Sequence, residues 1–302
     1  MFACSLAFQP CLLLAEIGTR IEASSREKNM KRWCVAAAIL AANVVSPTAH
    51  AETLCTVVAD AASGKVLVQN GDCATRVTPA STFKIALSLM GFDAGILKDE
   101  HTPTLAYHDG DVAWGGDAWR QPTDPARWIQ YSVVWFSQRV AQSLGDTRFQ
   151  HYADVFDYGN RDVSGEPGKH NGTAGAWINS SLQISPLEQV AFLRKVANRT
   201  LPVSATALDM TWRVTEIAAR PDGWTIHGKT GTGSPGAPIT HEGHYDRAHA
   251  YGWFVGWATK GSRTLVFARL TQDAQAQPAP AGMRTRDALL AELPSLVDGA
   301  TR

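Results

Sequence analysis

Ser81 and Lys84 are the residues whose types and spacing most clearly permit chemistry. They form the pattern Ser-x-x-Lys in a stretch whose apolar residues favour a buried helix. Side chains three positions apart share a helix face, so the lysine amine can approach the serine hydroxyl. A serine hydroxyl is a weak nucleophile until a neighbouring base takes its proton. The pattern alone is weak evidence, because Ser25 and Lys28 have the same spacing.

Two further motifs supply polar groups that a serine nucleophile needs. Ser132-Val133-Val134 opens a helical segment, and Lys229-Thr230-Gly231 ends a predicted strand. The second motif combines a cation and a hydroxyl with a backbone that needs little room. β-Lactamases and penicillin-binding proteins carry Ser-x-x-Lys, a serine element and Lys-Thr-Gly in this chain order. The three motifs together are therefore far more specific than any one of them.

Three more stretches make the sequence resemble the class D, or oxacillinase-type, serine β-lactamases. Tyr158-Gly159-Asn160 matches a loop motif of that class, residues 177–186 resemble the segment that begins with its pocket tryptophan, and residues 253–256 resemble the stretch after Lys-Thr-Gly. Val134 stands where penicillin-binding proteins carry Asn. The resemblance runs from about residue 53 to residue 296. It implies hydrolysis of the β-lactam ring of penicillin-type antibiotics, and resistance to them.

The resemblance also implies the roles of Ser81 and Lys84. Ser81 forms an acyl-enzyme, and Lys84 carries a carbamate formed from carbon dioxide, which converts a cation into an anionic general base. Only a neutral amine reacts in this way, and an apolar pocket favours neutral lysine. The indole N–H of Trp177 can donate a hydrogen bond to the carbamate. We expect four side chains to form the pocket: Phe83, Val134, Trp177 and Ile178.

On the substrate side, the resemblance assigns the oxyanion hole to two backbone N–H groups, those of Ser81 and Thr232. Ser132 relays a proton between Lys229 and the lactam nitrogen. Tyr158 and Asn160 are interpreted as loop architecture.

The substrate carboxylate is expected to meet Thr230, within the binding segment Thr230-Gly231-Thr232, and an arginine of the last helix. Arg286 fits the start of that helix, and Arg284 is the alternative.

The elements that position these residues are predicted from hydrophobic alternation and turn residues. A hairpin is expected from two runs, residues 54–59 and 65–69, and a second hairpin from residues 251–257 and 264–270. Ser185, Pro186 and Glu188 mark a helix start, and residues 286–296 are expected to close the chain as a helix. The fold class is therefore α+β. We expect an antiparallel sheet from both chain ends, flanked by helices, with an inserted mainly helical region, as in the serine β-lactamase/penicillin-binding-protein fold.

The N-terminal residues have the pattern of a secretory signal peptide. Met30-Lys31-Arg32 is a basic start, residues 33–45 are apolar, and Ala49-His50-Ala51 is a small-x-small cleavage site. We expect residues 1–51 to be a presequence, with Met30 as the true start, and residues 52–302 to be the catalytic domain. The expected location is the periplasm.

The cysteines agree with export. Only Cys55 and Cys73 remain after the presequence, and they flank the first predicted hairpin. An oxidising compartment allows them to form a disulfide, and two free buried thiols are the alternative.

Composition excludes several classes of function. Lys and Arg number 28, as do Asp and Glu, so no basic excess favours nucleic acid. No apolar run reaches the length of about 18 residues that a membrane span needs. Residues 231–236 read Gly-x-Gly-x-x-Gly but lead into a proline-containing loop, and His241 and His244 lack the zinc spacing. We therefore expect the protein to bind a small-molecule β-lactam and to use neither a metal nor a nucleotide. We also expect no membrane anchor. Whether the protein forms a homodimer stays open.

Two rival functions remain open. A penicillin-binding peptidase makes the same acyl-enzyme but transfers it to an amine, and a β-lactam sensor holds the acyl group because its lysine loses the carbamate. Val134, Tyr158-Gly159-Asn160 and Trp177 count against the first. Turnover of a chromogenic β-lactam distinguishes them, because a binder gives one burst and stops.

Overall fold

The computed structural model describes residues 51–219, 221–235 and 245–299. The predicted signal peptide and start codon therefore lie outside the described residues, as do His241 and His244. In the described part, no helix is both long and apolar enough to cross a membrane.

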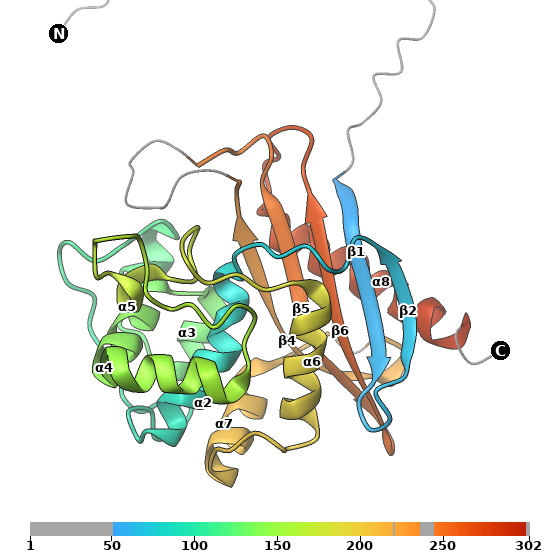
Figure 1. The fold of residues 1–302 in the computed structure, drawn as a ribbon, viewed down its shortest axis with the longest axis horizontal. Helices are drawn as coiled ribbons and strands as arrows, with labels where there is room; N and C mark the ends of the chain where they lie inside the picture. The colour runs from blue at the N-terminus through green and yellow to red at the C-terminus, as the bar shows by residue number, and fades with distance from the viewer. Residues whose placement is uncertain (1–50, 220, 236–244, 300–302) are drawn as a thin grey trace, which may run out of the picture. The chain divides into compact units, whose positions relative to one another are not determined.

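A six-stranded antiparallel sheet is built from both ends of the folded chain (Figure 1). Its order is β2-β1-β6-β5-β4-β3. The join between the two ends is the pairing of β1 with β6, in which Val57 lies opposite Ala268. This arrangement confirms the expected fold class. The strands are β1 (Glu52–Asp60), β2 (Val66–Gly71), β3 (Glu216–Ile217), β4 (Thr225–Gly233), β5 (Tyr251–Lys260) and β6 (Arg263–Gln272).

The helical region is inserted between β2 and β3, and one long helix follows β6. The inserted helices and 3-10 turns are η1 (Ala80–Phe83), α2 (Lys84–Asp93), η2 (Gly116–Trp119), α3 (Pro125–Tyr131), α4 (Val134–Phe156), α5 (Gly172–Gly175), α6 (Pro186–Ala197) and α7 (Ala205–Thr215). The turn η3 (Pro221–Gly223) precedes β4, and α8 (Ala281–Gly299) closes the fold.

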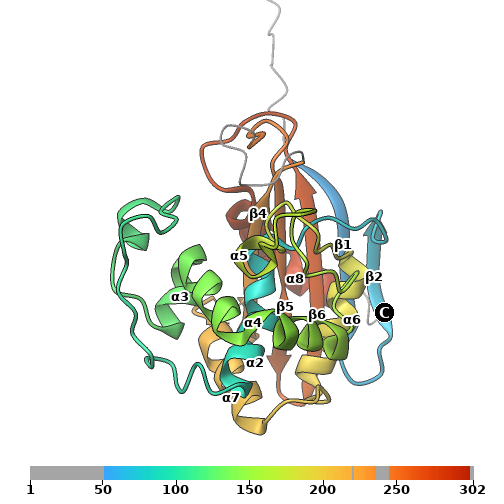
Figure 2. The same ribbon diagram turned by 60° about the vertical axis from the view of Figure 1, so that its left-hand side comes forward.

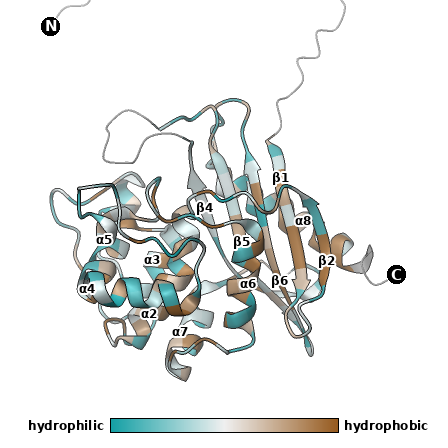
Figure 3. Cartoon of the chain, in the orientation of Figure 1, coloured by the Kyte–Doolittle hydropathy of each residue, from teal (hydrophilic) through white to brown (hydrophobic). Residues whose placement is uncertain are grey.

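Both faces of the sheet are buried. Alternate residues of a strand point to opposite faces, so Trp253 packs in the core under the inserted helices while Phe254 packs in a second core with Leu289 of α8. Figures 1 and 2 show α8 on the opposite face of the sheet from α2 and α6. The middle of β1 is accordingly hydrophobic, whereas the helices carry both kinds of residue (Figure 3). The sheet is the central layer that fixes the site.

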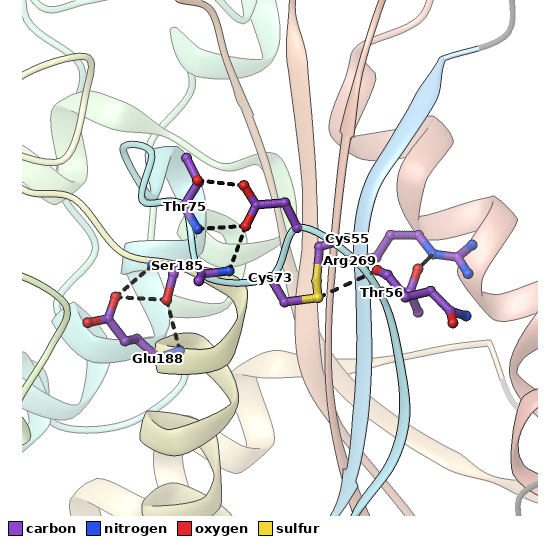
Figure 4. Close-up of a disulfide and its surroundings, with 10 residues drawn as sticks. Cys55, Thr56, Cys73, Thr75, Ser185, Glu188 and Arg269 are labelled. Atoms are coloured by element: carbon purple, nitrogen blue, oxygen red, sulfur yellow. Dashed lines mark hydrogen bonds between the residues drawn. A yellow bond between two sulfur atoms is a disulfide. The ribbon is translucent and has the colours of Figure 1, made fainter.

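The predicted disulfide between Cys55 and Cys73 is present, with a Cα–Cα distance of 5.1 Å (Figure 4). It ties β1 to the segment that leads from β2 to Ser81. The same segment is held on its other side by α6, because Leu187 N–H donates to the Cys73 carbonyl oxygen. The chain that enters the site is therefore anchored to both the sheet and the helical region.

Several element boundaries differ from the sequence prediction. Ser81 lies in the 3-10 turn η1, and Lys84 is the first residue of α2, so the pair spans a junction instead of one α-helix. Ser132 does not open a helix: it caps the end of α3 in a left-handed conformation (φ 60°). The last helix begins at Ala281, not at Arg286. The helix start at Ser185 is confirmed as a capping box with Glu188.

Candidate active site

The nucleophile candidate Ser81 lies in a tight turn that is fixed on both sides. Ala80, directly before it, adopts a left-handed backbone (φ 49°), which a residue with a Cβ rarely takes. Thr82 holds the turn closed, since its N–H and its hydroxyl both donate to the carbonyl oxygen of Pro79, at 3.1 and 2.7 Å. Strained backbone of this kind persists only where the surroundings enforce it, and it is concentrated at functional sites.

Lys84 lies beside Ser81. Its Nζ donates to Ser81 Oγ at 3.1 Å, and its side chain is fully buried. Burial, together with the nearby charge of Lys229, holds the pKa of Lys84 well below its usual value. A neutral amine of this kind can serve as a base or react with an electrophile, which an ordinary surface lysine cannot do.

Two of the predicted pocket residues, Phe83 and Trp177, pack together at the Ser81–Lys84 junction. Trp177 is buried and stacks on Phe83, with ring centroids 5.5 Å apart, and Phe149 meets it edge-on. Val134 is also buried, whereas Ile178 is only partly buried. Within the described residues, the indole N–H of Trp177 makes no hydrogen bond, so it is free to donate to a group on the lysine side.

Ser132 presents a hydroxyl without a partner. Its Oγ is buried and makes no hydrogen bond to any described residue. Such groups are rare because an unsatisfied buried hydroxyl costs about 1–3 kcal/mol. Together with the left-handed backbone at this position, the unsatisfied hydroxyl indicates a side chain kept for chemistry.

Lys229 projects from β4 toward the inserted helices. Ile226 of the same strand packs in the core beneath α8, so by alternation Lys229 points to the opposite face, which is that of Ser81. Burial and the nearby charge of Arg286 lower the pKa of Lys229 to about 7. Its Nζ donates to the carbonyl oxygen of Thr230 at 3.1 Å and lies 3.3 Å from the Thr230 hydroxyl.

The outer edge of β4 is open beside Lys229. The short strand β3 pairs only with Ile226 and His227, so within the described residues no strand pairs with this edge between Gly228 and Gly233. The backbone N–H and C=O groups along an open edge can bind an extended ligand. Gly231 brings β4 close to η1, since a Cβ there would lie 3.0 Å from the carbonyl oxygen of Pro79.

The start of α8 is clamped onto β4, a contact that the sequence did not reveal. The N–H of Gly282 donates to the Thr232 hydroxyl at 3.0 Å. A Cβ on Gly282 would lie 2.3 Å from the carbonyl oxygen of Gly231, so only glycine permits this approach. The clamp fixes Thr232 and the first turn of α8 relative to each other.

The two arginine candidates have different surroundings. Arg284 is held by the buried carboxylate of Asp273, with its Nη2 donating to Oδ2 at 2.5 Å. Arg286 is close enough to Lys229 to lower its pKa, and it pairs with the exposed neighbour Asp287. Arg284 is therefore occupied, and Arg286 is the arginine whose charge reaches the site.

The loop that contains Tyr158-Gly159-Asn160 is a scaffold. Gly159 has a left-handed φ of 56°, and a Cβ there would lie 2.1 Å from the carbonyl oxygen of Gln183. Asn160 Nδ2 donates to the carbonyl oxygen of Ser181 at 2.7 Å, which ties this loop to the segment after Trp177.

A buried serine–lysine pair, an unsatisfied serine and a strand-borne lysine on this α+β scaffold define a penicillin-recognising serine enzyme. The family model described as penicillin binding protein transpeptidase domain matches residues 54–294. Among the residues that the structure describes, no group of three or more His, Cys, Asp or Glu side chains could hold a metal ion.

Three relatives narrow the class. Beta-lactamase OXA-9 of Klebsiella pneumoniae is 43% identical over 247 residues, which cover 82% of this chain and 89% of that protein. Beta-lactamase OXA-1 of Escherichia coli is 37% identical over 227 residues, covering 74% and 78%. The crystal structure of the OXA-427 class D β-lactamase is 47% identical, with a TM-score of 0.74, and the match covers 82% of this chain and 99% of that one. The chain belongs to the class D serine β-lactamases.

Proposed function

We propose that this enzyme hydrolyses the β-lactam ring of penicillin-type antibiotics through an acyl-enzyme on Ser81 and thereby confers resistance to them. The observation that carries the proposal is the 3.1 Å contact between Ser81 Oγ and the fully buried Nζ of Lys84. Burial lowers the pKa of this amine and so favours the neutral form, which is the form that can take the serine proton.

The surroundings of Lys84 fit a carbamate formed from carbon dioxide. Burial and the nearby charge of Lys229 lower its pKa and so favour the neutral amine, which is the form that bonds to the carbon of carbon dioxide with loss of one proton. Phe83, Val134 and Trp177 provide a dry pocket, and the Trp177 N–H is an unused donor. When formed, the carbamate supplies an anionic oxygen base for the serine and for the hydrolytic water.

The remaining roles follow from the elements that carry the side chains. In acylation a bond forms between Ser81 Oγ and the lactam carbonyl carbon while the lactam C–N bond breaks. The backbone N–H groups of Ser81 and Thr232 stabilise the oxyanion. The serine proton leaves toward Lys84, and the unsatisfied hydroxyl of Ser132 delivers a proton to the leaving nitrogen.

Arg286→Ala is expected to raise the KM for a penicillin about ten- to a hundredfold, the value of one charge-assisted hydrogen bond to its carboxylate. Arg284→Ala is the matched comparison. It leaves the buried Asp273 without its cation, so its main effect is expected on thermal stability, with a smaller rise in KM. Steady-state kinetics and thermal melting of the two variants show which arginine binds the substrate carboxylate. A larger rise in KM for Arg284→Ala contradicts the assignment.

The function itself is tested by following a chromogenic β-lactam at low and high bicarbonate. We expect many turnovers per enzyme and faster turnover at high bicarbonate. A single burst followed by a stable acyl-enzyme indicates a sensor, and transfer of the acyl group to an added amine indicates a peptidase. For localisation we propose export to the periplasm, which the Cys55–Cys73 disulfide supports.

A further inference from the structure

Three polar side chains from distant parts of the chain meet beside the Ser81 turn. Thr78 precedes the turn, Asn179 follows the Trp177 segment, and Tyr251 is the first residue of β5. The hydroxyls of Thr78 and Tyr251 are hydrogen-bonded to each other. Both also donate to Asn179 Oδ1, with distances of 3.3 Å from Thr78 and 3.2 Å from Tyr251. We call these residues the Thr78–Asn179–Tyr251 triangle.

The three contacts are coupled, because the two hydroxyls have only two protons to donate among them. When Tyr251 donates to Asn179, the Thr78 hydroxyl donates either to Tyr251 or to Asn179. Tyr251 and Thr78 are both buried, so water does not replace a lost partner without cost. Removing the Tyr251 hydroxyl therefore leaves the single Thr78 proton to hold Asn179.

The triangle joins the two segments that must meet at Lys84. On one side the carbonyl oxygen of Thr78 accepts from Trp253 Nε1 at 3.1 Å, so the start of the nucleophile turn is fixed to the sheet. On the other side Asn179 lies two residues after Trp177, in a left-handed conformation (φ 47°). Trp177 itself stacks on Phe83, the residue before Lys84.

Packing does not enclose Asn179 on every side. It lines a cavity of about 340 Å³ together with Asp162, Ser164 and Ser180. A half-buried residue next to such a space can shift away from the site at little packing cost. The far end of the segment is held by the backbone pairing of Val77 with Ile184, and the hydrogen bonds of Asn179 to Thr78 and Tyr251 fix its near end, next to Trp177, against the turn.

We propose that Thr78, Asn179 and Tyr251 are positioning residues that hold the Trp177 segment against the Ser81 turn, and so determine how tightly Lys84 retains carbon dioxide. The inference rests on the proposed carbamate. The triangle itself does not touch the reacting atoms; it places the indole N–H, and the pocket wall, at the lysine. A residue of this kind changes carbamate occupancy without being required for the chemical step.

The test is a titration with ¹³C-bicarbonate, in which NMR measures the carbamate on Lys84 directly and turnover is followed in parallel. Tyr251→Phe removes only the hydroxyl. Asn179→Gly removes the amide but accepts the left-handed backbone. Both are expected to raise the bicarbonate concentration for half occupancy about three- to tenfold, the value of one net hydrogen bond, and the double variant is expected to add little more. At saturating bicarbonate the rate is expected to recover.

Tyr152→Phe is the matched control, because its hydroxyl donates to Asp93 Oδ2 at 2.7 Å, in a contact made by α4 and α2. It is expected to lower thermal stability without changing bicarbonate affinity. An unchanged affinity in Tyr251→Phe, or an equal loss in Tyr152→Phe, overturns the inference while the carbamate of the wild type stands. If Tyr251→Phe does not fold, the bicarbonate affinity of Thr78→Val tests the inference in its place. No carbamate signal in the wild type overturns both the inference and the proposed base.

Discussion

Ser81→Ala is expected to abolish covalent labelling by penicillin and to lower turnover by at least about 10⁴-fold, as for other enzymes that lose their nucleophile. The reason is geometric. Ser81 combines a buried lysine at 3.1 Å with a strained turn that lies close to Gly231 of β4. An alanine side chain fits the turn, so the variant is expected to fold. Mass spectrometry of the enzyme after incubation with a penicillin measures the adduct.

Two serine variants serve as comparisons for this result. Ser143→Ala changes an exposed residue of α4 and is expected to label like the wild type. Ser132→Ala keeps the nucleophile, so it is expected to label more slowly yet still form the adduct. A penicillin adduct on the Ser81→Ala variant refutes the assignment of the nucleophile.

The motifs and the sheet could be predicted from sequence because they depend on local patterns. Strand alternation located β1, β5 and β6, and the Ser185 cap located the start of α6. Residues 205–215 were not predicted as a helix, although Ser204 caps α7 by accepting from Ala207 N–H. That cap was the signal that could have located it.

The start of α8 could not be predicted, because a tertiary contact overrides local propensity there. Gly282 is a poor helix former, but its missing side chain lets the helix approach Gly231. The pairing of Asp273 with Arg284 and the Thr78–Asn179–Tyr251 triangle likewise join distant residues. Sequence spacing carries no information about such contacts, so it left Arg284 and Arg286 as alternatives.

Lys84→Ala is expected to slow both acylation and hydrolysis of the acyl-enzyme by about 10²–10⁴-fold, the usual contribution of a general base. Hydrolysis is expected to suffer more, because it must also activate a water molecule. Rapid-mixing kinetics with a chromogenic β-lactam separate the two phases. Lys84→Met, which fills the buried space, controls for the cavity, and Lys98→Ala changes an exposed lysine. Near-normal rates in both Lys84 variants contradict a role as base.

The pH dependence of activity provides an independent test of Lys84 as the base. Burial and Lys229 lower the pKa of Lys84, which favours its neutral amine, and the amine becomes a cation as pH falls through that lowered pKa. Wild-type activity is therefore expected to fall on the acid side and to recover with bicarbonate, while Lys84→Ala shows no recovery. Lys229, with a pKa of about 7, loses its charge above that pH, so KM for a carboxylate-bearing substrate is expected to rise there. An anion on Lys84 favours the charged form of Lys229, so bicarbonate is expected to move this rise to higher pH. Profiles of rate against pH at two bicarbonate concentrations measure both the acid-side fall in activity and the rise in KM. If neither changes with bicarbonate, Lys84 acts as an uncarboxylated amine.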